Sequence, residues 1–92
     1  MRKIEHEDWE LQINSNKLIT ITKLGESREY KTDVITEVKQ EAEYVFLHHE
    51  DNSFTQVKFE ADDFLVIDKF DVEGELIKEI GCHVFGEGGE DE

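Results

Sequence analysis

The chain has 92 residues with a hydrophobic fraction of 37%, enough for one folded domain with a modest core. It contains 24 acidic and 10 basic residues, which give a net charge of −14. Direct binding to nucleic-acid phosphates or to an anionic membrane requires the opposite sign of charge, so the composition disfavours both partners.

The N-terminal part of the chain shows the two-residue period of β-strands. The first eight residues are largely charged, and we expect them to form a lead-in arm. From there Trp9, Leu11 and Ile13 point one way and the intervening residues are polar, as in a strand with one solvated face. Residues 14–16 predict the turn that follows it.

Two further strands are predicted before the middle of the chain. The side chains of residues 17–24 alternate with a period of two and predict the first of these strands. Gly25 supplies the backbone freedom that the next turn requires. Residues 30–38 combine Thr and Val content with alternation, which favours a single long strand over a helix.

Residues 44–59 form the most distinctive segment and predict a β-hairpin. Both arms are rich in aromatic and β-branched residues, which favour a half-buried pleated surface. Between them, residues 51–53 are Asp, Asn and Ser, whose side chains hydrogen-bond back to the main chain in turns. We therefore place this hairpin near the centre of the sheet.

Residues 64–67, Phe-Leu-Val-Ile, are apolar on both faces and indicate a covered strand. The alternative is one short helix over residues 61–70, capped by Asp62, which would make the protein α+β. Residues 71–74 predict a turn, followed by a strand with a bend or bulge at Gly81.

Strand-like segments joined by short turns, without a strong helix, predict a mostly β fold. We expect a single-domain antiparallel meander over residues 1–85, forming a small sandwich or an open barrel. Residues 86–92 have nothing to bury and are expected to form a flexible acidic tail. The side chains expected in the core are Trp9, Leu11, Ile13, Ile19, Ile21, Val34, Val38, Tyr44, Phe46, Val57, Phe59, Phe64, Val66, Leu76, Ile80 and Val84.

No motif in this sequence specifies enzymatic or metal chemistry. His48–His49 and Cys82–His83 are adjacent pairs, and neighbours on a strand point to opposite faces, so neither pair suits one metal ion or a catalytic dyad. Residues 68–75 alternate acids before a glycine but lack the ligand series of a calcium loop. We therefore expect no enzyme activity, no catalytic residues, no metal site and no cofactor.

The negative charge is concentrated in the second half of the chain. Residues 1–46 contain ten acidic and seven basic residues, whereas residues 47–92 contain fourteen and three. Carboxylates on a rigid scaffold can fill a groove built for phosphates and can steer association. The sequence therefore predicts a small acidic module that binds a basic protein surface, as inhibitors and immunity proteins that mimic nucleic-acid charge do. The carboxylates expected to bind are Glu60, Asp62, Asp63, Asp68, Asp71, Glu73, Glu75 and Glu79.

A second interpretation assigns the acidity to solubility and the function to self-association. Both faces of residues 64–67 are apolar, and a homodimer or a larger assembly would cover the face that the chain leaves open. The single cysteine, Cys82, excludes an internal disulfide and indicates a reducing cytoplasm. The first residues have acids where a signal peptide requires an apolar run.

Overall fold

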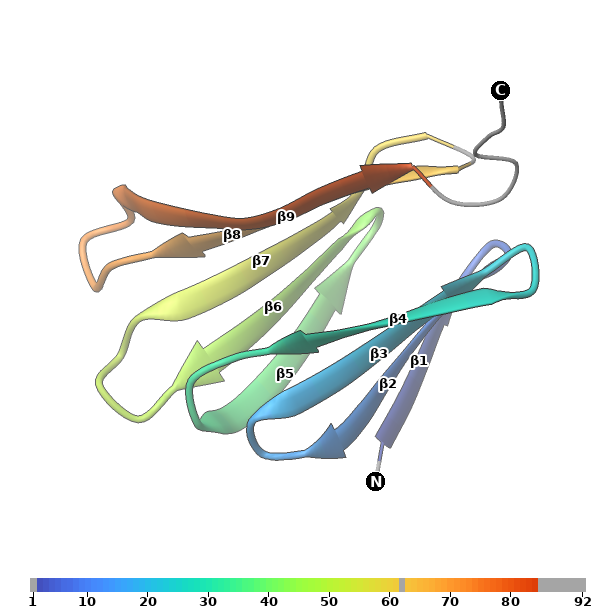
Figure 1. The fold of residues 1–92 in the computed structure, drawn as a ribbon. Coiled ribbons are helices and arrows are strands. Elements are labelled where there is room, and N and C mark those ends of the chain that lie inside the picture. The colour runs from blue at the N-terminus through green and yellow to red at the C-terminus, as the bar shows by residue number, and fades with distance from the viewer. Residues whose placement is uncertain (1, 62, 85–92) are drawn as a thin grey trace.

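Over the described residues, 2–61 and 63–84, the computed structural model forms nine antiparallel strands in two sheets and no helix (Figure 1). The first sheet has the strand order β1-β2-β3-β4, and the second has the order β5-β6-β7-β8-β9. The strands are β1 (Arg2–His6), β2 (Trp9–Ser15), β3 (Leu18–Lys23), β4 (Glu26–Lys31), β5 (Ile35–Glu41), β6 (Tyr44–His49), β7 (Phe54–Phe59), β8 (Phe64–Phe70) and β9 (Leu76–Val84).

Both sheets are meanders, because each strand pairs with the strands that precede and follow it in the sequence. The chain passes once from the first sheet to the second, between β4 and β5 (Figure 1). The inner faces of the two sheets share one hydrophobic core, and neither sheet closes into a barrel. The predicted antiparallel β fold is confirmed. Residues 86–92, predicted to be a tail, lie outside the described residues.

The expectation of an N-terminal arm is wrong, because residues 2–6 form strand β1. This strand lies at the edge of the first sheet, with Ile4 opposite Leu11 of β2. Ile4 is buried in the core, whereas the charged residues beside it are exposed. One apolar side chain among charged neighbours is enough for an edge strand that buries only one face.

The single long strand predicted over residues 30–38 is also wrong. Residues 32–34 separate β4 from β5, and the two strands belong to different sheets. The backbone N–H of Thr32 donates to the Lys17 carbonyl at 2.9 Å, and that of Ile35 donates to the Asn16 carbonyl at 2.7 Å. The β2–β3 turn thus accepts the hydrogen bonds that a continuous strand would give to its neighbours.

The central hairpin is confirmed as β6 and β7. Its turn contains Asn52 with a φ of 71°, and the His49 N–H donates to the Ser53 carbonyl at 2.9 Å. Asp51 Oδ1 accepts a hydrogen bond from the Ser53 N–H at 3.0 Å. The polar turn residues therefore act as the sequence predicts, since Asn tolerates a left-handed backbone and Asp closes an Asx turn.

Residues 64–70 form strand β8 rather than the alternative helix. Its partner β9 contains two residues without a register partner, Ile77 and Ile80, and the second lies directly before Gly81. The predicted bulge at Gly81 is thereby confirmed, and the edge of the second sheet carries a second one.

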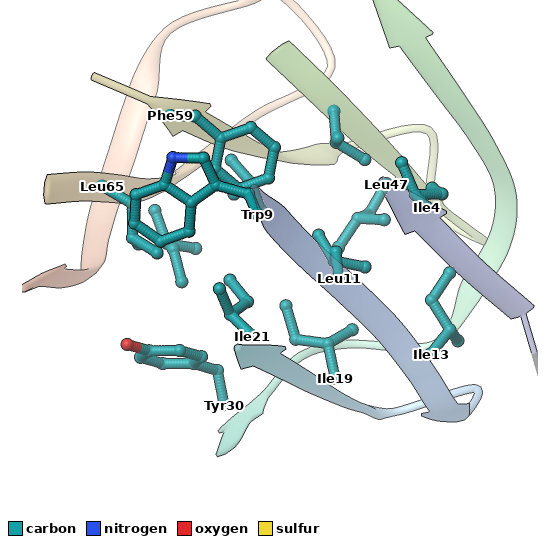
Figure 2. Close-up of a cluster of buried hydrophobic side chains, with 13 residues drawn as sticks. Ile4, Trp9, Leu11, Ile13, Ile19, Ile21, Tyr30, Leu47, Phe59 and Leu65 are labelled. Carbon is teal, nitrogen blue, oxygen red and sulfur yellow. The ribbon is translucent and has the colours of Figure 1, made fainter. Parts of the chain in front are cut away.

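The core joins the two sheets through aliphatic side chains and aromatic stacking (Figure 2). The Trp9 and Phe59 rings stack across the sheets with their centroids 5.0 Å apart. The core side chains are Ile4, Trp9, Leu11, Ile13, Ile19, Ile21 and Tyr30 from the first sheet, and Val45, Leu47, Val57, Phe59, Leu65 and Ile67 from the second.

On the second sheet several predicted core residues face outward. Tyr44, Phe46, Phe64 and Val66 are half-buried on the outer face, because alternation gives the inner face to their aliphatic neighbours on β6 and β8. The other core predictions have mixed outcomes. Val38 and Ile80 pack against the core, Val34 is only partly buried, Leu76 is 60% exposed, and the side chain of Val84 lies outside the description.

Candidate functional site

The two sheets differ in what they present to solvent. The outer face of the first sheet is polar, and its side chains form hydrogen bonds with one another. Gln12 Nε2 donates to Asn14 Oδ1 at 2.7 Å, and the hydroxyls of Thr22 and Ser27 lie 2.7 Å apart. The outer face of the second sheet instead presents a cluster of five rings, which we call the aromatic cluster. Its members are Tyr44, Phe46, His48, Phe54 and Phe70.

The aromatic cluster is continuous across β6, β7 and β8. Tyr44 stacks on Phe46 with centroids 5.9 Å apart, and Phe46 meets the edge of Phe54 at 6.1 Å. His48 lies 5.9 Å from Phe54, and Phe54 stacks on Phe70 at 5.1 Å. Such ring pairs contribute about 0.5–1.5 kcal/mol beyond the area they bury, so the rings hold one another in place.

Strand register extends this cluster to the edge of the sheet at β9. Phe54 is opposite Phe70, and Phe70 is opposite Leu76, whose side chain is 60% exposed. The neighbouring register row contains Asp68 and Glu79, which are opposite each other on β8 and β9. We call these two acids the carboxylate pair.

The carboxylate pair is electrostatically unfavourable as it stands. Burial raises the pKa of Asp68 above its ordinary value of 3.8, and the charge of Glu79 raises it further. No described residue forms an ion pair with either acid. Two neighbouring carboxylates without a counter-ion attract a cation, because a positive charge near them stabilises both ionised forms.

The two lysines in this part of the chain point away from the carboxylate pair. Lys69 and Lys78 are register partners, and both line a hollow on the inner side with Thr55 and Ile80. Lys69 is bound to Asp33, and this contact lowers the pKa of the Asp33 carboxyl below its ordinary value. Acids and bases of β8 and β9 are thus segregated onto opposite faces.

The other acids predicted to bind are spread over both ends of β8 and β9. Glu60 follows β7 and pairs with Lys58 at 3.1 Å, and Asp63 is partly buried before β8. Glu73 and Glu75 are exposed at the β8–β9 turn. Asp71 organises that turn, because its Oδ1 accepts hydrogen bonds from the Glu73 and Glu75 N–H groups, both at 2.9 Å.

The predicted acids therefore do not form one cluster. Asp68 and Glu79 meet on the outer face, Asp71 is a structural turn residue, and Asp62 lies outside the described residues. The acid-rich segment resembling a calcium loop is this Asx turn.

The histidines lie apart from one another. His48 belongs to the aromatic cluster on the outer face, whereas His49 is buried on the inner face. His49 Nδ1 donates to the Val34 carbonyl at 2.9 Å, so in the neutral ring Nε2 accepts from the Thr55 hydroxyl at 2.7 Å. His49 on β6 therefore links residues 32–34, which connect the two sheets, to β7 through hydrogen bonds.

The remaining metal and dyad candidates are also separated. His6 stacks on Phe59 at 5.5 Å. Cys82 and His83 are opposite Val66 and Leu65, and their side chains lie outside the description. Within the described part of the chain, no three His, Cys, Asp or Glu side chains are grouped as metal ligands.

Sequence reasoning missed the aromatic cluster because it placed Tyr44 and Phe46 in the core. The signal was present in the hairpin. Val45 and Leu47 alternate with the aromatic residues, so the aliphatic and aromatic sets must face opposite sides of the sheet. Combining this alternation with the hairpin register would have placed Phe54 on the aromatic side.

Comparison with known proteins finds no match to a protein family, to a curated protein or to a solved structure. No helix with the length and apolarity needed to cross a membrane occurs within residues 2–61 and 63–84.

Proposed function

We propose that this protein is a non-enzymatic, acidic protein-binding module that engages a positively charged protein surface. Inhibitors and immunity-type proteins that mimic nucleic-acid charge are the class it fits. The observation that supports this function is the segregation of charge on β8 and β9. The carboxylate pair lies on the outer face beside the aromatic cluster, and the two lysines of these strands face the other way.

This arrangement matches the anatomy of a binding surface. Aromatic residues are enriched in the buried centres of protein interfaces, where they contribute most of the binding energy, and charged residues form the rim. The aromatic cluster supplies such a centre. Carboxylates at its margin supply attraction for a basic partner, which raises the association rate more than the affinity. A net charge of −14 adds long-range steering of the same sign.

The test uses an oligolysine peptide as a defined basic probe and two-dimensional NMR of the labelled protein. We expect the amide signals of β8 and β9 to shift on titration, and the apparent affinity to fall steeply with salt. Charge reversal of the carboxylate pair, Asp68→Lys with Glu79→Lys, should weaken binding and reduce its salt dependence. Asp71 is left unchanged because its reversal would disrupt the β8–β9 turn.

A matched control reverses two acids on the outer face of the first sheet, Glu5→Lys and Glu29→Lys. Both double variants change the net charge by the same amount, so a general charge effect would weaken both equally. Equal weakening, or shifts spread over both sheets, would contradict a binding role for the second sheet.

The second candidate is an oligomeric module in which the same outer face covers another copy of the chain. The half-buried Phe64 and Val66 and the exposed Leu76 favour this function. Two features oppose pairing through the edges of the second sheet. Strand β9 has two bulges, and β5 has a register shift and exposed charged residues. Sedimentation equilibrium of the protein alone distinguishes the candidates, since a dimeric mass would favour the second.

We extend the proposal to location: a single cysteine in the whole chain suits a reducing cytoplasm. Fractionation of the native host with an antibody tests this part separately from binding.

A further inference from the structure

The corner of the outer face over β7, β8 and β9 combines two kinds of recognition. Phe54 and Phe70 stack with their planes 11° apart and their centroids 5.1 Å apart, and their register row continues to Leu76 at the edge. In the next register row lies the carboxylate pair. Residues of one strand that share a face are about 7 Å apart, so the stacked rings and the carboxylate pair lie within the span of one long side chain.

Charges elsewhere on this face leave the corner open to a cation. The outer face also carries Lys39 on the edge strand β5 and Lys58 on the central strand β7, opposite Val66. Lys58 is already engaged, since its Nζ lies 3.1 Å from Glu60 and 5.6 Å from the centre of the Tyr44 ring. The corner is therefore both apolar and uncompensated in charge.

Arginine is the side chain that uses both features at once. Its guanidinium is planar, stacks on aromatic faces, binds carboxylates in a bidentate manner and is more weakly hydrated than an ammonium group. Lysine offers a compact, strongly hydrated charge and gains less from stacking on an aromatic ring.

We infer that this corner is an arginine-binding site for a basic segment of a protein partner. The inference rests on the proposed function and names the side chain that the surface selects. The guanidinium continues the Phe54–Phe70 stack and donates to Asp68 and Glu79, while the rest of the segment follows the aromatic cluster. A second copy of this chain is a poor occupant, because each copy would bring its own carboxylate pair to the contact.

The test compares a hexa-arginine and a hexalysine peptide of equal charge by calorimetry and NMR. We expect the arginine peptide to bind about two- to fivefold more tightly, the ratio that corresponds to a cation–π contact at an exposed site. Phe70→Leu should bring the two affinities together, because it keeps an apolar side chain and removes the ring. Phe54→Leu is an independent second variant, and the dispersion of the amide signals verifies folding of each.

Two controls locate the effect. Tyr44→Leu removes a ring of the same cluster outside this corner and should leave the arginine preference unchanged. Asp68→Asn with Glu79→Gln should lower the affinity for both peptides. Neutralisation of two acids at the far margin, Glu37→Gln with Glu41→Gln, should lower it less.

The outcomes separate the two proposals. Equal affinities in the wild type, or an arginine preference that survives both phenylalanine variants, would overturn the arginine site while leaving a basic partner in place. If neither peptide shifts signals of the second sheet, both proposals fail. A preference that disappears in Phe70→Leu and persists in Tyr44→Leu supports the site.

Discussion

Asp68 is held where its own charge is unfavourable. Burial and the neighbouring Glu79 both favour its protonated form, so its pKa lies above that of an aspartate in an unfolded chain. Between these two pKa values the folded protein binds more protons than the unfolded one, and stability falls as the pH rises. A residue kept at such a cost fits a role in binding better than a role in folding.

Replacement of Asp68 by Asn should therefore raise the free energy of unfolding near neutral pH. Asn resembles the protonated carboxyl, so the gain should shrink as the pH falls and disappear below about 3.9, where the unfolded carboxyl is also protonated. Urea denaturation at several pH values, followed by the fluorescence of the single tryptophan, measures the gain. A loss of stability at neutral pH would show that the Asp68 charge is compensated.

Phe46 and Phe59 are two phenylalanines of the central hairpin with different environments. Phe59 is 5% exposed and stacks on Trp9, so Phe59→Ala should cost about 3–5 kcal/mol. The sequence alone predicts the same cost for Phe46. Because Phe46 is half-buried on the outer face, Phe46→Ala should cost only about 1–2 kcal/mol. Thermal unfolding of both variants checks this order, and equal costs would contradict the register.

At the scale of elements, the hairpin between β3 and β4 contains a suboptimal turn. Its two connecting residues, Leu24 and Gly25, have φ values of 55° and 80°, as a type I′ turn requires. Glycine adopts this backbone freely, but leucine does so with steric strain, and Leu24 is also 63% exposed. The leucine at position 24 is therefore a poor match for the backbone conformation of this turn.

Leu24→Asn should stabilise the protein by about 0.5–1 kcal/mol, because Asn-Gly is the preferred sequence for this turn. The midpoint of urea unfolding should rise while the slope of the transition stays the same. Leu24→Ala serves as the control, since it removes the exposed apolar side chain without relieving the backbone. An equal gain in both variants would show that exposure, not backbone strain, is responsible.

The fold was largely predictable at this scale, because strand formation depends on local alternation and on turn residues. The β6–β7 hairpin, the strand at 64–67 and the bulge at Gly81 all carry such local signals. Strand β1 and the break at residues 32–34 were missed. The first depends on the single buried side chain of Ile4, and the second on hydrogen bonds to the β2–β3 turn.

The candidate site was harder to predict, because it depends on register across strands. Sequence shows that acids accumulate after residue 60 but not that Asp68 and Glu79 meet. The two bulges of β9 set the register that places Glu79 opposite Asp68. Apart from Gly81, the sequence carries no reliable local signal for these bulges. Which face of a strand is buried also depends on the opposite sheet, which is why Phe46 was placed inside.

At the scale of the whole molecule, a net charge of −14 produces self-repulsion that opposes compactness. In the described part of the chain, few of the acids are compensated by direct ion pairs. Lys3 pairs with Glu10, Lys23 with Asp8, Arg28 with Glu26, Lys58 with Glu60, and Lys69 with Asp33. Exposed pairs of this kind contribute little to stability, so long-range repulsion remains.

The melting temperature should therefore rise between low and moderate sodium chloride. The Debye length shortens to about 10 Å near 0.1 M salt, which screens the repulsion between separated acids. Differential scanning calorimetry measures the rise, and potassium chloride should give the same increase because screening does not depend on the cation. A flat or falling melting temperature would show that the acids are compensated locally.

The single passage between the two sheets bears on how the chain folds. Every hydrogen-bonded strand pair joins sequence neighbours, so each sheet can grow by zipping successive hairpins without first closing a long loop. Folding rates fall as contacting residues become more distant in sequence, so this topology favours faster folding than a sandwich with interleaved strands. Association of the two preformed sheets would then be the late step, and the Trp9 ring, which stacks on Phe59 across the interface, would report it directly.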